Sequence, residues 1–125
     1  MAKFKFPLEP PSEEERESVC PLLFAQNVIA GRWKIIILWY LSQQIRRFNE
    51  LQRLLPNISK GILTRQLREL EDDGLVHREV YKEVPPKVEY SLTSKGRSFI
   101  PALDMMGKWG KEYMDRKEPN SSLQS

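Results

Sequence analysis

The stretch that decides the fold runs from residue 57 to residue 74 and reads NISKGILTRQLRELEDDG. Ser59 is suited to cap a helix because its hydroxyl can accept a hydrogen bond from a backbone N–H of the first turn. Gly74 supplies the left-handed residue on which helices commonly end. The stretch therefore predicts a single helix with a start signal and a stop signal.

The two faces of this helix differ in chemistry. At helical spacing the apolar side chains fall on one arc, namely Ile62, Leu63, Leu67 and Leu70. The opposite arc carries Gly61, Thr64, Arg65 and Arg68. The major groove of DNA admits a helix and displays hydrogen-bond acceptors to arginine. Arginine on an outer face is also common in soluble proteins, so the helix alone leaves both interpretations open.

Charge is distributed unevenly along the 125 residues, whose net charge is only +3. Residues 31–70 contain eight lysines and arginines and two glutamates, a balance of +6, whereas residues 1–20 contain three basic and five acidic residues, a balance of −2. A basic block around the helix 59–74 is the electrostatic footprint expected for a polyanion. A well-solvated surface is the alternative that charge alone does not exclude.

Length and composition narrow the class of protein. A chain of 125 residues with 40% hydrophobic content is expected to form one globular domain. The longest apolar run, residues 35–41, is far shorter than the roughly 18 residues of a membrane span, and no signal-peptide core follows Met1, so we expect a cytoplasmic protein. A single cysteine excludes an internal disulfide, and one cysteine with one histidine cannot form a structural zinc site. No catalytic motif or cofactor loop is recognisable, and His77 is interpreted as a sheet-surface residue.

The first half of the chain reads as an arm followed by helices. Residues 1–19 contain three prolines and a Ser12 capping box that predicts a short acidic helix. A domain of residues 20–117 is expected to start at a second helix, capped by Cys20 with Pro21 in its first position, which ends at Gly31. Residues 35–41 predict a central buried helix, residues 45–47 an extended segment, and Asn49 the capping box of a helix that ends before Pro56.

The second half adds a hairpin and a long helix. Residues 75–81 and 88–92 predict two strands, joined by a tip at 82–87 that carries Lys82 and Lys87. A last helix is expected from Thr93 or Ser94 to about residue 116, kinked at Pro101, and residues 118–125 are expected to form a disordered tail. The predicted fold class is mainly α with a small β-hairpin: a winged helix-turn-helix with N- and C-terminal dimerisation helices.

Several separated motifs occur in one order: CP at 20–21, GRWK at 31–34, RFNEL at 47–51, LTRQLREL at 63–70, GLV at 74–76, VPPKVEYSLT at 84–93 and GR at 96–97. Together they resemble the HxlR-type winged-helix regulators of bacterial transcription over about residues 20–110. The resemblance implies a homodimer on double-stranded DNA with an inverted-repeat operator, and the terminal helices as the dimer seam. It also implies that some members sense oxidants or electrophiles through a cysteine at the position of Cys20.

The expected functional residues form two surfaces and one candidate sensor. The DNA-binding residues are expected to be Ser59, Lys60, Gly61, Thr64, Arg65, Arg68, Lys82 and Lys87. The dimer interface is expected to comprise Leu22, Leu23, Phe99, Leu103, Met106, Trp109 and Tyr113. Cys20 is a candidate sensor because a helix N-terminus favours a thiolate, although a small buried hydrophobe is nearly as common a role for cysteine. Two other functions stay open: a winged-helix protein–protein adaptor without DNA binding, and a regulator switched by a small ligand in the dimer interface.

Overall fold

The computed structural model describes residues 12–114 and contains six helices and three strands within that range. The helices are α1 (Glu13–Val28), α2 (Lys34–Gln43), α3 (Phe48–Leu54), α4 (Lys60–Asp72), α5 (Ser94–Arg97) and α6 (Ile100–Met114). The strands are β1 (Arg46–Arg47), β2 (Val76–Tyr81) and β3 (Lys87–Leu92). The predicted arm at residues 1–11 and the predicted tail at residues 118–125 lie outside the described residues. No helix between residues 12 and 114 is long and apolar enough to cross a membrane.

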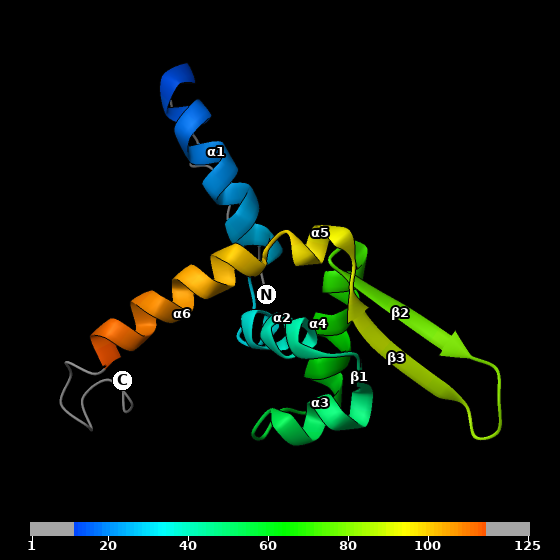
Figure 1. Ribbon diagram of the computed structural model, residues 1–125. Coiled ribbons are helices and arrows are strands. Elements are labelled where there is room, and N and C mark those ends of the chain that lie inside the picture. The colour runs from blue at the N-terminus through cyan, green and yellow to red at the C-terminus, as the bar shows by residue number, and fades with distance from the viewer. Residues whose placement is uncertain (1–11, 115–125) are drawn as a thin grey trace.

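The helices α2, α3 and α4 pack beside an antiparallel sheet to form a winged body (Figure 1). The sheet has the order β1-β3-β2, with Arg46 opposite Tyr90 and Val76 opposite Leu92. The core between helices and sheet is built from leucines and isoleucines such as Ile37, Leu51 and Leu67, each at most 1% exposed. This confirms the predicted class, a mainly helical winged helix-turn-helix fold.

Helix α4 begins and ends at the predicted residues. The Ser59 hydroxyl accepts a hydrogen bond from the Ile62 amide at 3.1 Å. At the other end Gly74 has a φ of +84°, its amide donates to the Glu71 carbonyl, and the Leu75 amide donates to the Leu70 carbonyl. This is the Schellman pattern, in which a glycine in the left-handed conformation satisfies the last carbonyls of a helix. It turns the chain directly from α4 into β2.

The sheet and α5 hold this turn in place. The Thr93 hydroxyl donates to the Gly74 carbonyl at 2.6 Å and accepts from the Gly96 amide at 3.0 Å. A Cβ atom on Gly96 would overlap the carbonyl oxygen of Leu75, so only glycine allows α5 to lie this close to the start of β2. The end of α4 is therefore fixed to the wing and to α5.

Two expectations about the N-terminal half are wrong. Residues 13–28 form one continuous helix capped by Ser12, so Cys20 does not cap a helix and Pro21 lies inside α1. Proline removes one N–H from the helical ladder, but good helix formers on both sides continue the helix through it. Helix α3 starts one residue before Asn49, with Arg47 as its N-cap and the Arg47 amide donating to Glu50 at 3.1 Å.

Two further expectations need correction. The last helix is not one kinked rod, because α5 ends at Arg97 and α6 starts at Ile100, which places Pro101 in the first turn, where proline is tolerated. Ile62, expected in the core, is 37% exposed because it lies at the edge of the apolar arc of α4. Helix α2 is central as predicted, yet Ile36 and Trp39 on its outer side are nearly half exposed.

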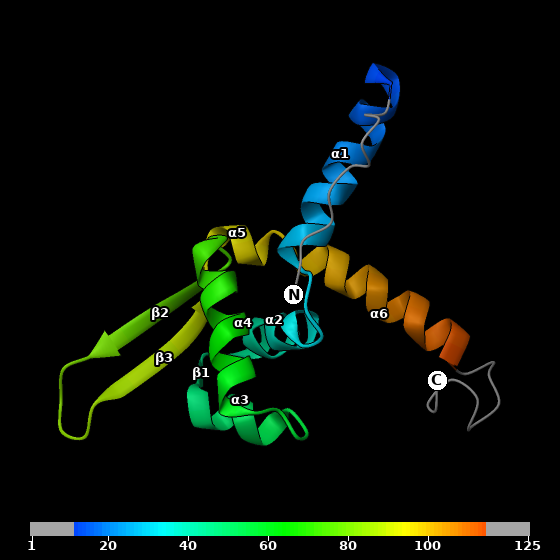
Figure 2. The same ribbon diagram turned by 180° about the vertical axis from the view of Figure 1, so that it is seen from behind.

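Helices α1 and α6 leave the winged body in diverging directions, as both ribbon views show (Figures 1 and 2). None of the side chains described in α1 is buried, and α6 buries only Leu103. The two helices consequently make up little of the core of this chain.

Candidate nucleic-acid interface

The outer face of α4 is open along its whole length. Arg65 and Arg68 are exposed, and Thr64 is half-buried beside Arg68, one turn earlier on the helix. A Cβ atom on Gly61 would meet no atom of another element within 4 Å in the described part of the chain. Together with Lys60 and Glu69 these residues line a shallow depression of about 510 Å³. The structure thus brings together five of the predicted DNA-binding residues, with Ser59 at the adjoining cap. Cations beside a bare glycine create a face that a polyanion can approach closely.

A second hollow of about 350 Å³ separates α4 from the sheet and reveals a basic residue that the sequence reasoning missed. Arg78 of β2 reaches this hollow opposite Thr64 and Arg68 and lies 3.6 Å from the Glu71 carboxylate. Burial raises the pKa of Tyr90, which lines the same hollow, although Arg78 and Arg68 oppose the shift. Strand alternation is the signal that could have found Arg78, because it shares a face with Val76.

The two lysines of the wing differ in their surroundings. Lys82 is exposed at the tip. The Lys87 ammonium lies 3.9 Å from Glu89, 4.0 Å from Glu83 and 4.4 Å from the centre of the Tyr81 ring. Glu89 accepts a hydrogen bond from Tyr81 and raises the pKa of its hydroxyl. The positive charge of Lys87 is therefore partly balanced by Glu83 and Glu89, whereas Lys82 is exposed to solvent.

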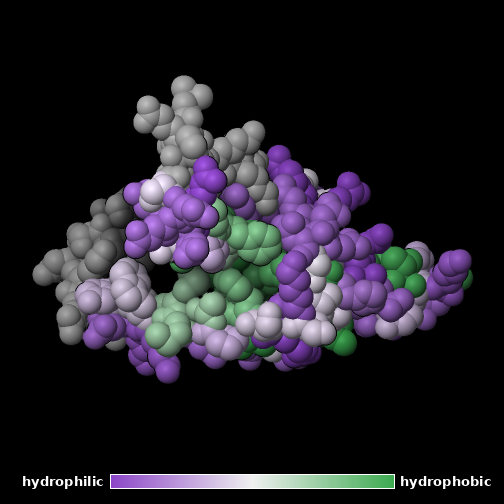
Figure 3. Space-filling model, turned by 90° about the horizontal axis from the view of Figure 1, so that it is seen from above, coloured by the Kyte–Doolittle hydropathy of each residue, from purple (hydrophilic) through white to green (hydrophobic). Residues whose placement is uncertain are grey.

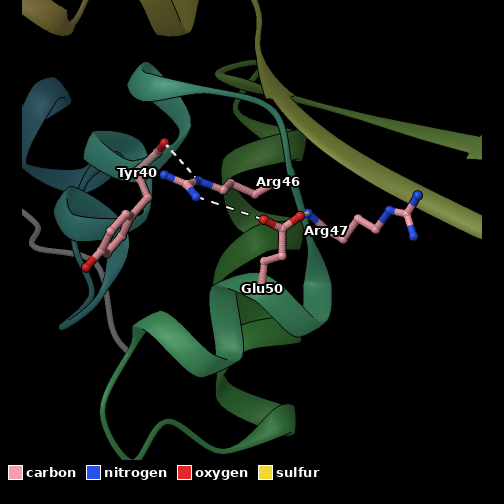
Figure 4. Close-up of polar contacts among 4 residues, drawn as sticks. All are labelled: Tyr40, Arg46, Arg47 and Glu50. Carbon is pink, nitrogen blue, oxygen red and sulfur yellow. Dashed lines mark hydrogen bonds and ion pairs between the residues drawn. The ribbon is translucent and has the colours of Figure 1, made fainter.

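Strand β1 carries two arginines with different roles (Figure 4). Arg46 donates to the Tyr40 carbonyl at 3.4 Å and lies 3.9 Å from Glu50, so it links α2 to α3. The amide of Arg47 is held by Glu50, but its exposed guanidinium points away from both Tyr40 and Glu50 (Figure 4). Arg47 adds a further cation at the N-terminus of α3.

Most of the predicted dimer residues are exposed on α1 and α6. Leu22 is 71% exposed and Trp109 67%, while Met106 and Tyr113 are exposed to a smaller extent. A hydrophobic area with a hollow beside it is visible from above, where α1 points toward the viewer (Figure 3). The expectation that Leu103 lies in the dimer interface is wrong, because Leu103 is buried in the core of its own chain. Leu23 and Phe99 are half-buried.

Cys20 is exposed in the middle of α1. The argument for a thiolate at a helix N-terminus therefore does not apply, and the argument for a buried packing role does not apply either. His77 is exposed on the sheet, as predicted, and lies 3.0 Å from Glu79. Among residues 12–114, no group of three or more His, Cys, Asp or Glu side chains is arranged to hold a metal ion.

Comparison with known proteins identifies a family model and several relatives that match this chain. A family model described as HxlR-like helix-turn-helix matches residues 28–118. The chain is 53% identical over 97 residues to the uncharacterised HTH-type transcriptional regulator YdeP of Bacillus subtilis (strain 168), a match that covers 78% of this chain and 76% of YdeP.

Two solved structures share the fold. The redox regulator HypR in its reduced form is 50% identical with a TM-score of 0.74, covering 76% of this chain and 94% of HypR. The reduced form of the transcriptional regulator YodB from B. subtilis is 32% identical with a TM-score of 0.69, covering 79% of this chain and 98% of YodB. The chain therefore belongs to the HxlR-like helix-turn-helix family of transcriptional regulators.

Proposed function

We propose that this regulator binds double-stranded DNA sequence-specifically, as a homodimer that places one α4 helix in the major groove of each half of an inverted repeat. The observation that carries the proposal is the outer face of α4, where Thr64 and the exposed Arg65 and Arg68 lie together while Leu63, Leu67 and Leu70 on the opposite face are buried in the core. A guanidinium fork matches the O6 and N7 acceptors of guanine, which gives such a helix a means of reading sequence.

The surrounding residues divide into reading and positioning roles. Thr64 and Arg65 reach base edges. Lys60 and Arg68 bind phosphates near the two ends of the reading face, and the Ser59 cap and bare Gly61 let the backbone approach the DNA. Lys82 carries the wing to the flanking backbone, with a smaller contribution from Lys87 because of its carboxylate neighbours. As a member of a family found in bacteria such as Bacillus subtilis, the protein is proposed to act in the cytoplasm, where bacterial chromosomal DNA lies.

The second copy is proposed to cover α1 and α6. Large apolar side chains such as Phe24, Trp109 and Met114 are each more than 60% exposed, and monomeric proteins rarely leave a contiguous patch of this kind open. On α6, a Cβ atom on Gly107 or Gly110 would meet no atom of another element within 4 Å among residues 12–114, which leaves room for a close-packed partner helix.

Selection of bound sites from random duplexes tests this function. We expect enrichment of an inverted repeat whose half-sites lie about one helical turn apart, roughly 10 bp, or a multiple of it. Binding should weaken steeply as salt rises, because each phosphate contact releases counterions. Light scattering should give twice the chain mass of 14.7 kDa. Absence of binding to any duplex at low salt would instead favour the protein–protein adaptor.

We further propose that Cys20 makes DNA binding sensitive to oxidants or electrophiles. Two observations support this: the thiol is exposed on α1, in the proposed dimer seam, and the similar regulator HypR has structures in both reduced and oxidised forms. A peroxide would take two electrons from the thiolate to give a sulfenic acid, which then condenses with a small thiol or with Cys20 of a second copy.

The test compares wild type with Cys20→Ser for binding to the selected duplex before and after mild peroxide. We expect a change in affinity in the wild type alone. The same response in both proteins, or none in either, would remove Cys20 from regulation.

A further inference from the structure

Lys34 is the one lysine in the described part of the chain whose side chain is fully buried, at 0% exposure. It is the first residue of α2, and its ammonium lies 2.7 Å from a carboxylate oxygen of Glu69 on α4. Among the described residues, the Lys34 ammonium makes no hydrogen bond of good geometry. Within the same part of the chain, its positive charge is therefore balanced by the ion pair with Glu69 alone. Burying a lysine costs several kcal/mol on the general scale for ions in proteins, which makes such a pair expensive as a mere stabiliser.

A second tie lies one turn away on the same side of α4. Gln66 is only 8% exposed, and its carbonyl oxygen accepts a hydrogen bond from the Trp33 amide at 3.1 Å. Gly31 makes room for this side chain, because a Cβ atom there would lie 3.0 to 3.2 Å from three atoms of Gln66. Gln66 and Glu69 therefore both reach the first turn of α2 from neighbouring turns of α4.

The Lys34–Glu69 ion pair and the Gln66–Trp33 hydrogen bond lie next to the outer face of α4, which carries Arg65 and Arg68. Glu69 follows Arg65 by four residues, so it lies beside Arg65 on the α4 surface, and it lines the same depression as Arg68. The core contacts of Leu63, Leu67 and Leu70 on the inner face are apolar and non-directional, and they tolerate a small rotation or slide of the helix. The Gln66–Trp33 hydrogen bond opposes both movements, because hydrogen bonds weaken steeply with misalignment. The Lys34–Glu69 ion pair opposes them as well, because a movement that separates the pair leaves the buried ammonium without its partner.

We propose that Lys34 and Gln66, through Glu69 and the Trp33 amide, are positioning residues that fix the rotation and height of α4 so that Arg65 meets its base. This inference rests on the proposed DNA binding. Lys34 itself touches no DNA, since it is buried, and it acts through the register of the reading helix. Of the buried ion pair's known uses, fixing register is the best attested.

The decisive variant is the apolar swap Lys34→Met with Glu69→Leu. It keeps the net charge and refills the site with side chains of similar volume, and such swaps commonly preserve or raise stability. We expect the variant to melt close to the wild-type temperature and to keep its salt slope. The ratio of affinities for the selected and a scrambled duplex should fall on the order of tenfold, as for the loss of one base contact. An unchanged ratio would overturn the proposal.

A matched pair of single variants separates positioning from charge. Glu69→Gln and Glu71→Gln each remove one carboxylate from α4, but the partner of Glu71 is Arg78, which is 44% exposed, whereas the partner of Glu69 is buried Lys34. We expect Glu71→Gln to keep the wild-type ratio and Glu69→Gln to lose it. Equal ratios in the two variants would contradict a positioning role.

Amide hydrogen exchange on the free protein tests the same inference without DNA. In the apolar swap, exchange of the Trp33 amide and of residues 60–72 should accelerate, while residues 76–92 keep their protection. Unchanged exchange in α4 would overturn the inference even if the wild type bound no duplex. Failure of the proposed function is recognised separately, as absence of wild-type binding in the site selection.

Discussion

The winged body and the two projecting helices use their apolar residues in opposite ways. Helix α4 buries Leu63, Leu67 and Leu70 to 1% exposure or less, whereas α1 has no buried side chain among its described residues. Yet both segments contain leucines and other large apolar side chains. The same residue types thus build the core in one region and stay exposed in the other, so burial and not composition identifies the residues that we propose to contact a second copy.

The largest effect is expected from a substitution in the core of the winged body. Leu67→Ala should lower the free energy of unfolding by about 2–5 kcal/mol, because it leaves a cavity in the well-packed core. Denaturant melts measure this loss, which should be the same at low and high protein concentration. A loss well below 1 kcal/mol would mean that α4 is not packed as described.

The matching change in α6 should act through assembly. Trp109→Ala removes a side chain that is 67% exposed in the single chain, so the fold of one copy should change little. The dimer should weaken by about 2 kcal/mol or more if Trp109 is a central anchor of the interface. Dilution series in light scattering or sedimentation measure this change, with Lys108→Ala on the same helix as the control. Equal dissociation of both variants would place the dimer surface elsewhere.

Two basic residues sharpen the contrast within the body. Arg65→Ala should relax preference at one base pair by about 1–3 kcal/mol, since it removes a base contact. Lys82→Ala should weaken all duplexes alike and reduce the salt slope by about one charge. Titrations of the selected and scrambled duplexes at several salt concentrations separate the two effects. If Arg65→Ala behaves like Lys82→Ala, α4 contacts only the backbone.

The smallest effect concerns the cap of α4. Ser59→Ala should cost about 1 kcal/mol, because the Ile62 amide loses its hydrogen-bond acceptor. Thermal melts measure it, and Ser12→Ala at the start of α1 is the comparison. The cost of Ser12→Ala should be smaller in the melt of the body, because none of the described side chains of α1 is fully buried and Ser12 lies at the end of α1 far from the core contact of Val28.

Local signals predicted the body well. Ser59 and Gly74 marked α4 because a cap and a left-handed residue leave direct traces in the sequence. The alternation of apolar and polar residues in β3 likewise predicted that strand, and residues 82–87 were expected to join the two strands. Thr64, Arg65 and Arg68 were expected on the outer face from helical spacing alone, and the structure places them there.

What the sequence could not supply depends on contacts between distant residues. Nothing in the local sequence indicates that Glu69 lies 2.7 Å from Lys34, or that Gln66, which falls within the apolar arc of α4, accepts a hydrogen bond from the Trp33 amide. Cys20-Pro21 resembles a helix start, but the cap at Ser12 and the helix formers around it carry α1 through the proline. The spacing of Leu103 matches the exposed stripe of α6, and only the packing of that helix on the body shows it buried.

The proposed homodimer, with one α4 helix in each half-site, is tested by varying the distance between the half-sites of the selected operator. Two α4 helices held at a fixed separation by α1 and α6 can both enter the major groove only on one face of the duplex. Inserting about 5 bp, half of a helical turn, should lower affinity by at least about tenfold, because the second half-site then faces the other side of the duplex. Affinity that does not change with spacing would contradict the account, because the two reading helices would then act independently.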